Sequence, residues 1–175
     1  MSLRSVVRRL LGREELPPGF DGHLDADERV LATAPLPQGE HVVVTTLGIW
    51  LPKPSGARRV GWHHVSKATW SSGAIGLVEA DEVDTIEGAV LLADRPVRRL
   101  PLAEPGRVPQ VVHERVTASV RTRQRLELPG GGAWVVQRKV PGRDGVVLQV
   151  RPDPGTDEAV LRQAVTDVAR APRLS

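Results

Sequence analysis

The longest apolar segment of the chain runs from Val42 to Leu51 and is rich in β-branched residues. Both of its period-2 faces are apolar or threonine, which is typical of a strand buried on both sides. A turn at residues 52–56 leads into a second strand-like segment, which passes through Val60 and Trp62 and ends at Trp70. Two such segments joined by a short turn predict an antiparallel pair.

The alternation of the second segment breaks after Trp62. Val60 and Trp62 are two positions apart, but the next large apolar residue is Val65, three positions further on. In a strand, a step of three indicates a bulge or kink that re-aims the side chains. We therefore predict a kink between Trp62 and Val65, and a buried core that contains Trp50, Trp62, Val65 and Trp70.

Shorter apolar segments bounded by turn residues lie on either side of this pair. They are expected as strands at residues 28–34, 74–78, 86–93 and 96–102, with an acidic hairpin tip at 79–84. A helix follows: Pro109 fits its first turn, and Val108, Val112 and Val116 lie on one face. The pattern predicts an α+β fold, with six or seven strands in a bent antiparallel sheet that one helix closes.

This plan resembles pleckstrin-homology-like (PH-like) domains. Residues 43–50 (VVTTLGIW) and 60–65 (VGWHHV) are similar to a strand pair of PH-like and GRAM-like proteins of high-GC bacteria, with Gly61 where proline is usual. The resemblance covers residues 24–118 and implies a PH-like domain at 23–118 without a transferable activity. Phosphoinositide-binding members carry Lys and Arg in the loop that here spans 35–40, and that loop holds no basic residue. Phosphoinositide binding is therefore not expected.

The chain continues beyond the predicted helix. Strands are expected at 119–128, 133–140 and 146–151, separated by glycine-rich turns at 129–132 and 141–145. A last helix is expected from about 157 to 170, with Thr156 as its N-cap. Residues 119–175 are thus a three-stranded β extension with a C-terminal helix, which forms either a second unit or an extension of the first sheet.

Residues 1–22 are predicted to be a basic amphipathic helix followed by a proline-containing linker. Apolar residues recur at helical spacing opposite arginines, and Gly12 ends the pattern. Such a helix binds a membrane surface or a partner, or it docks on its own domain.

Composition narrows the function classes. The 21 Arg, three Lys and 21 acidic residues give a net charge of +3, which permits a polyanionic partner without requiring one. The absence of cysteine excludes disulfides, thiol catalysis and cysteine-based metal sites. No segment has the pattern of a signal peptide or of a membrane-spanning helix, so we expect a cytoplasmic protein.

One group of residues is a candidate for anion binding. Arg121, Arg123 and Arg125 alternate along a predicted strand, so their side chains project from one side about 7 Å apart. If the strand at 133–140 pairs with it, Trp134 and Arg138 join that side, and arginine beside an exposed aromatic ring is typical of sheet-based nucleic-acid binders. The alternative is the solvated face of a half-buried sheet.

Other candidates for chemistry lack a complete motif. His63 and His64 have no accompanying ligand spacing, the glycines at 130–132 lack the setting of a phosphate-binding loop, and the serines at 71–72 lack a nucleophile elbow. The acidic residues at 21–27 lack the Gly and Glu of a calcium loop. We therefore predict no catalytic residue, no metal and no cofactor.

The sequence thus favours a non-enzymatic PH-like interaction module that binds a protein partner or associates with itself. Binding would use the groove beside the helix at 109–116, or strand addition at an open sheet edge. The alternative function is binding of nucleic acid or an anionic membrane through the arginine face and the N-terminal helix. An enzyme is the third class.

Overall fold

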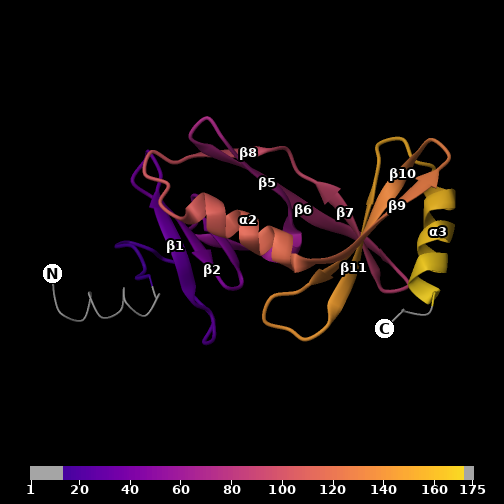
Figure 1. The fold of residues 1–175 in the computed structure, drawn as a ribbon, viewed down its shortest axis with the longest axis horizontal. Helices are drawn as coiled ribbons and strands as arrows, with labels where there is room; N and C mark the ends of the chain where they lie inside the picture. The colour runs from indigo at the N-terminus through magenta and orange to yellow at the C-terminus, as the bar shows by residue number, and fades with distance from the viewer. Residues whose placement is uncertain (1–13, 172–175) are drawn as a thin grey trace. The chain divides into compact units, whose positions relative to one another are not determined.

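The computed structural model describes residues 14–171, so the helix predicted in residues 1–12 lies outside the described residues. The chain divides into two compact units. Within the described residues, unit 1 comprises 14–79 and 96–118, and unit 2 comprises 80–95 and 119–171. Residues 80–95, which the sequence analysis placed in the domain at 23–118, group with residues 119–171 instead. Figure 1 shows the order of the elements. None of the helices in residues 14–171 combines the length and the apolar character needed to cross a bilayer.

Unit 1 begins with a four-stranded antiparallel sheet in the order of the sequence. Its strands are β1 (Val30–Pro35), β2 (His41–Thr45), β3 (Gly48–Leu51) and β4 (Arg58–Gly61). Nearly every residue of β2 and β3 is buried, as the apolar pattern of both faces predicts.

Residues 42–51 do not form the single strand that the sequence indicates, because a turn after Thr45 separates β2 from β3. The Thr45 hydroxyl accepts hydrogen bonds from the amides of Leu47 and Gly48, both at 3.2 Å. A threonine side chain that binds the backbone two or three residues on stabilises a turn. The chain therefore reverses inside a segment whose hydrophobicity is continuous.

The predicted kink is present as one turn of 3₁₀ helix, η1 (Trp62–His64), between β4 and β5 (Val65–Ser71). Trp62 and Val65 are fully buried there, and the Trp62 indole N–H donates to the carbonyl of Thr45 at 3.1 Å. Trp50 is also buried. Three of the four predicted core residues are thus confirmed, and the indole of Trp62 fixes the corner to the β2–β3 turn.

The second sheet of unit 1 and helix α2 (Val108–Ser119) complete its core. β5 and β8 (Arg98–Pro101) pair with the first part of β6 (Ala74–Ile86), one on each side. The buried helix residues Val108, Val111 and Val112 pack in one apolar cluster with Trp62 and residues of both sheets.

The second part of β6 belongs to unit 2. It pairs with β7 (Ala89–Asp94), which lies parallel to β11 (Val146–Pro152). The sheet continues through β10 (Gly131–Lys139) and ends with β9 (Val120–Leu128). The predicted acidic hairpin tip at 79–84 is wrong, because β6 continues through it and the turn comes at Glu87–Gly88, where both residues have positive φ. Two residues with positive φ form the tight turn that hairpins favour.

Helix α3 (Glu158–Arg170) packs its buried Leu161 and Val165 on one face of the unit 2 sheet. The N-cap is Asp157, whose carboxylate accepts from the amide of Val160 at 2.9 Å. The prediction of Thr156 is therefore wrong by one residue. The Thr156 hydroxyl instead bonds to both backbone groups of Gly132, so it joins the helix start to β10.

Candidate functional site

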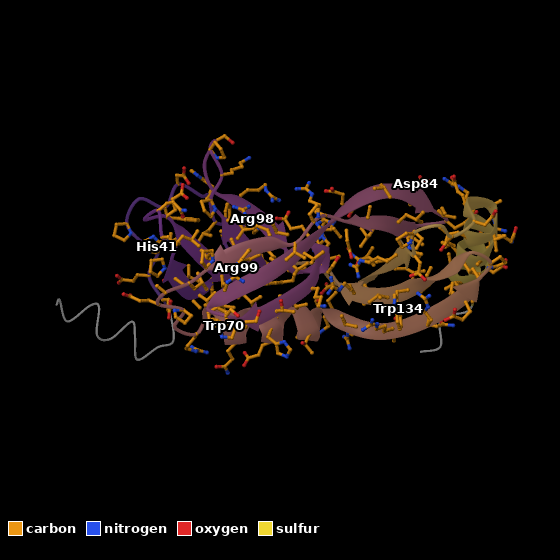
Figure 2. All side chains as sticks on the ribbon, turned by 90° about the horizontal axis from the view of Figure 1, so that it is seen from above. His41, Trp70, Asp84, Arg98, Arg99 and Trp134 are labelled. Carbon is orange, nitrogen blue, oxygen red and sulfur yellow. The ribbon has the colours of Figure 1, made fainter. Side chains whose placement is uncertain are left out.

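A groove between β5 and α2 is the first candidate site, and it contains the fourth tryptophan predicted to lie in the core. The prediction that Trp70 is buried is wrong: the residue is 44% exposed. Its backbone lies opposite the buried Ile75, so the indole is on the apolar side of the sheet. Near the end of β5, however, α2 does not cover the ring, and Trp70 remains at the surface of unit 1 (Figure 2).

The groove has a small cavity of about 100 Å³ beside this indole. Its walls come from β5, β6 and α2 and consist of Ala68, Thr69, Trp70, Ile75, Pro109, Val112 and His113. Apart from one hydroxyl and one imidazole, these side chains are apolar. The cavity can therefore take one apolar side chain, and it holds no pair of groups suited to acid–base chemistry.

The backbone of β5 is open beside this cavity. β5 is the last strand in its sheet and pairs with no other described strand than β6. The turn that joins them has positive φ at Ser72 and Gly73, the two-residue type in which the flanking Ser71 and Ala74 form a hydrogen-bonded pair. Alternation then directs the N–H and C=O groups of Ala68 and Trp70 away from β6, along the free edge.

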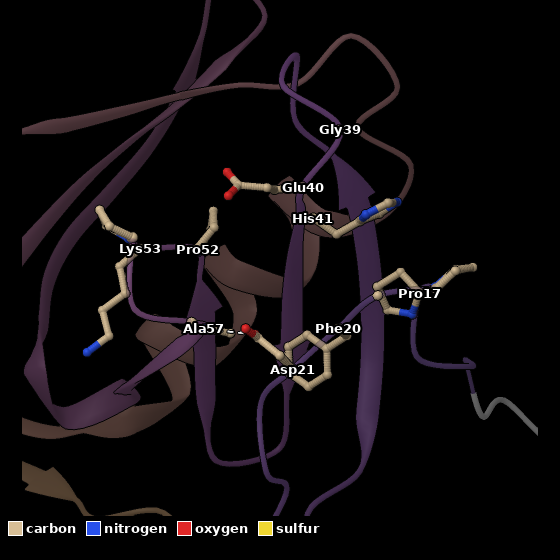
Figure 3. A pocket seen from close by; sticks show the side chains of 13 residues that line it. Pro17, Phe20, Asp21, Gly39, Glu40, His41, Pro52, Lys53 and Ala57 are labelled. Carbon is tan, nitrogen blue, oxygen red and sulfur yellow. Dashed lines mark hydrogen bonds between the residues drawn. The ribbon is translucent and has the colours of Figure 1, made fainter.

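A second, larger cavity of about 330 Å³ lies where residues 17–21 cross the loops of unit 1 (Figure 3). Phe20 packs edge-on against Trp50 with ring centroids 5.5 Å apart, and the Asp21 carboxylate accepts from the amide of Ala57 at 2.8 Å. Residues 17–21 therefore pack on unit 1, although the sequence analysis assigned them to a linker. Glu40 and His41 line this cavity and project in different directions (Figure 3), so these two side chains do not form an acid–base pair.

A buried carboxylate that the sequence analysis missed lies at the start of β1. The Glu28 side chain is fully buried. It accepts from the Trp50 indole at 2.9 Å and from the amide of Asp25 at 3.0 Å, and it also bonds with Thr45 and Arg59. Every partner donates a hydrogen bond to this carboxylate, so we assign this cluster a structural role. No periodic signal distinguishes Glu28 from the acidic residues just before it.

The four arginines predicted to form one anion-binding face differ in the structure. Arg125 is held by two carboxylates: it binds Asp153 through two guanidinium nitrogens and Glu127 at 3.0 Å. These hydrogen bonds raise the pKa of Arg125, first through Asp153, and Arg125 lowers the pKa of Asp153 in turn. Its charge is therefore already neutralised within the chain.

Arg138 is not a surface residue, so its assignment to the anion-binding face is wrong. It is 2% exposed, and burial, followed by repulsion from Arg151, lowers its pKa to about 10. The period-2 pattern places Arg138 on the same side of β10 as Trp134, but alternation alone does not report how deeply a position is covered.

Arg121 and Arg123 are exposed, and within residues 14–171 no carboxylate pairs with either. The guanidinium of Arg123 lies over the Trp134 ring at 4.0 Å, and that of Arg125 lies 5.5 Å from the same ring. A register shift leaves Arg121 opposite no residue of β10. The structure therefore brings Arg123, Arg125 and Trp134 together, and it leaves the charges of Arg121 and Arg123 for a ligand.

The histidines, glycines and serines that the sequence analysis considered for chemistry lie in turns of the backbone. His63 and His64 lie in η1 with their rings 4.0 Å apart. In the described part of the chain, no group of three or more His, Asp or Glu side chains is placed to hold a metal ion. Gly130 forms the β9–β10 turn with Pro129, and Ser72 forms the β5–β6 turn.

Comparison with known proteins gives no relative: no family model, no curated protein and no solved structure matches this chain.

Proposed function

We propose that this protein is a non-enzymatic PH-like interaction module that binds an extended segment of a partner protein between β5 and α2. The observation that carries the proposal is the exposed Trp70 on a free strand edge, beside an apolar cavity. A four-stranded meander, a second sheet formed by β5, β6 and β8, and a closing helix are the plan from which the PH-like assignment comes.

The free edge of β5 indicates how such a segment binds. A segment that adds to β5 gains backbone hydrogen bonds from Ala68 and Trp70, and strand addition of this kind is a common mode of peptide recognition. An apolar side chain of the same segment fills the cavity and covers part of the indole. Exposed tryptophans frequently dominate binding energy in such surfaces.

A test begins with a displayed library of random peptides, selected against the full-length protein. Binders should lose at least tenfold in affinity when Trp70 is replaced by Ala, because an interface tryptophan contributes about 2 kcal/mol or more. Val97→Ser is the matched control, since Val97 is another exposed apolar residue of unit 1, at 66%. Its removal should leave the affinity unchanged.

Two results would contradict the proposal. One is the absence of any enriched peptide. The other is a set of binders with equal affinity for the wild type and Trp70→Ala. Light scattering on both proteins separates a partner segment from a second copy of this chain: a dimer that Trp70→Ala dissociates would assign the groove to self-association.

A further inference from the structure

The outer edge of the unit 2 sheet at β9 has the properties of a second binding site. β9 is nine residues long and is the last strand in its sheet. Residues 121–124 are exposed on both faces, and the pairing with β10 runs from Leu128 to Thr122 without a register shift. Natural sheet edges are usually protected by bulges, prolines or short strands. From Thr122 to Leu128, β9 has neither a bulge nor a proline, and its register shift lies near its start, at Arg121.

The other edge of the same sheet differs. There the second part of β6 carries a register shift at Val83. Its acidic side chains are paired as well: Asp81 binds Arg95 and Asp84 binds Arg162. A bulge and internal ion pairs make that edge unsuited to pairing with another strand, so β9 is the edge of unit 2 at which a strand can add.

Hydrogen bonds of Gly132 show which backbone groups of β9 are open. Its carbonyl accepts from the amide of Asp153 at 2.8 Å, and its N–H donates to Thr156, so both groups point away from β9. Gly132 pairs with Glu127, which makes that pair a non-hydrogen-bonded one. By alternation, the backbone groups of Glu127, Arg125 and Arg123 point to the free edge.

The same alternation determines which side chains lie beside these open backbone groups. Arg123 and Arg125 lie on the face that carries Trp134. Arg125 is neutralised by Asp153 and Glu127, whereas Arg123 keeps its charge and is oriented by the ring beneath it. Stacking on an aromatic ring leaves the N–H edge of a guanidinium free to bind a carboxylate.

A second copy of β9 does not fit this edge. The open backbone groups of this edge belong to odd-numbered residues, so two antiparallel β9 strands can bond only where odd-numbered residues face one another. In every such register in which Arg123 faces a residue of β9, at least one arginine lies opposite arginine. Like charges directly opposite each other destabilise a strand pair. The charge of the edge calls for a strand that carries carboxylates at alternate positions.

We propose that the β9 edge binds an acidic peptide in the extended conformation. The peptide adds to the sheet as a sixth strand of unit 2, through the backbone groups of Arg123 and Arg125. A carboxylate of the peptide faces Arg123, and Arg121, two positions away in sequence, adds a second exposed positive charge. This site is independent of the β5–α2 groove, and it requires a protein strand because a polynucleotide cannot continue the backbone ladder.

The test uses a fluorescent peptide of alternating Glu and Val, added to the full-length protein at moderate salt. We expect saturable binding, with a roughly tenfold loss of affinity in Arg121→Ser/Arg123→Ser. Lys139→Ser/Arg143→Ser is the matched control, because it removes two exposed positive charges of unit 2 away from the edge. A lysine–valine peptide should not bind.

Amide hydrogen exchange distinguishes strand addition from simple charge attraction. In the free protein the amides of Arg123 and Arg125 should exchange quickly, and those of Thr122 and Gln124 slowly. The peptide should slow the first pair by tenfold or more. N-methylation of every second peptide residue should abolish binding when it blocks the amides that face β9. It should have little effect when it blocks the amides that point away from β9.

Four results would overturn the proposal: no binding, equal binding to the control and the arginine variant, unchanged exchange at Arg123 and Arg125, or displacement of the peptide by a single-stranded oligonucleotide of equal affinity. The last would assign the edge to nucleic acid. Trp70→Ala should bind the acidic peptide normally, so failure at one site leaves the other site testable.

Discussion

At the scale of single residues, the polar cluster around Glu28 is the most consequential feature of unit 1. A buried carboxylate is costly unless it is paired and hydrogen-bonded, and here four partners surround it. Arg59 binds it and also lies 5.6 Å from the Trp50 ring. The cluster joins the start of β1 to β3, β4 and the β2–β3 turn.

Replacing Glu28 by Ala should lower the free energy of unfolding by about 1–3 kcal/mol, because the buried indole N–H of Trp50 is left without its acceptor. Glu28→Gln keeps one acceptor and should cost less. Denaturant unfolding at pH 7 measures both changes. The exposed Glu104→Ala is the control, and a Glu28→Ala midpoint within error of the wild type would contradict the structural role.

The sequence pattern predicted the kink between Trp62 and Val65 better than it predicted which side chains are exposed. The step of three from Trp62 to Val65 located the 3₁₀ turn correctly, because side-chain phase along a strand is a local property. Trp70 and Arg138 were misplaced in opposite directions, since their exposure depends on which distant elements cover each strand end. The polar partners of Glu28 are up to 31 positions away in sequence, so no local pattern indicates them.

At the scale of elements, the positions of the turns, and not the hydrophobic pattern, determine where the strands begin and end. Thr45 interrupts an apolar segment, and the acidic residues at 81–84 continue a strand instead of ending it. The first effect is local, since the Thr45 hydroxyl binds the next amides, whereas pairing with β7 overrides the low strand propensity of the acidic residues. Helices α2 and α3 were predicted closely, because each has an apolar stripe and end signals within its own sequence.

Helix α3 is joined to the β6–β7 hairpin by two ion pairs, Arg162 with Asp84 and Arg170 with Glu87. The pKa of Asp84 is lowered by the amide of Thr85 and by Arg162, and the pKa of Glu87 is lowered by Arg170. A carboxylate whose pKa is lower in the folded state stabilises the fold above its unfolded value. That stabilisation is lost as the pH falls through the folded value.

We therefore expect Asp84→Asn/Glu87→Gln to lower the melting temperature at pH 6, and the difference from the wild type to disappear as the pH falls below about 4. Thermal melts at a series of pH values measure this. Asp144→Asn, in an exposed loop of unit 2, should show no such convergence. A difference that persists unchanged at pH 2.5 would show that the substitutions act through packing instead.

At the scale of the whole molecule, the net charge of +3 is mild, and several arginines of residues 14–171 already have acidic partners, among them Arg59, Arg125 and Arg162. This limits the alternative function of binding nucleic acid through the arginine face. Of the four arginines that the sequence nominated, only Arg121 and Arg123 are exposed without an ion pair in the described residues.

Two phosphate contacts imply a log–log salt slope of about −1.4 for a single-stranded oligonucleotide. We expect weak binding with a slope no steeper than that. Arg123→Ser should make the slope shallower by about 0.7. Arg125→Ser should leave it unchanged, because Asp153 and Glu127 already neutralise that side chain. Equilibrium titrations at several salt concentrations measure it, and a slope of −4 or steeper would show a larger nucleic-acid surface than these residues provide.

The strand β6 has a consequence for how the chain is made. Its first part is a central strand of unit 1, but its second part and β7 find their partner strand, β11, only at residues 146–152. During synthesis, Ile86, Ala89 and Leu91 therefore leave the ribosome well before the residues that bury them. Synthesis must reach β11 before the β6–β7 hairpin can be buried. A nascent chain halted near residue 118 therefore exposes an apolar, aggregation-prone strand pair to the quality-control machinery of the cell.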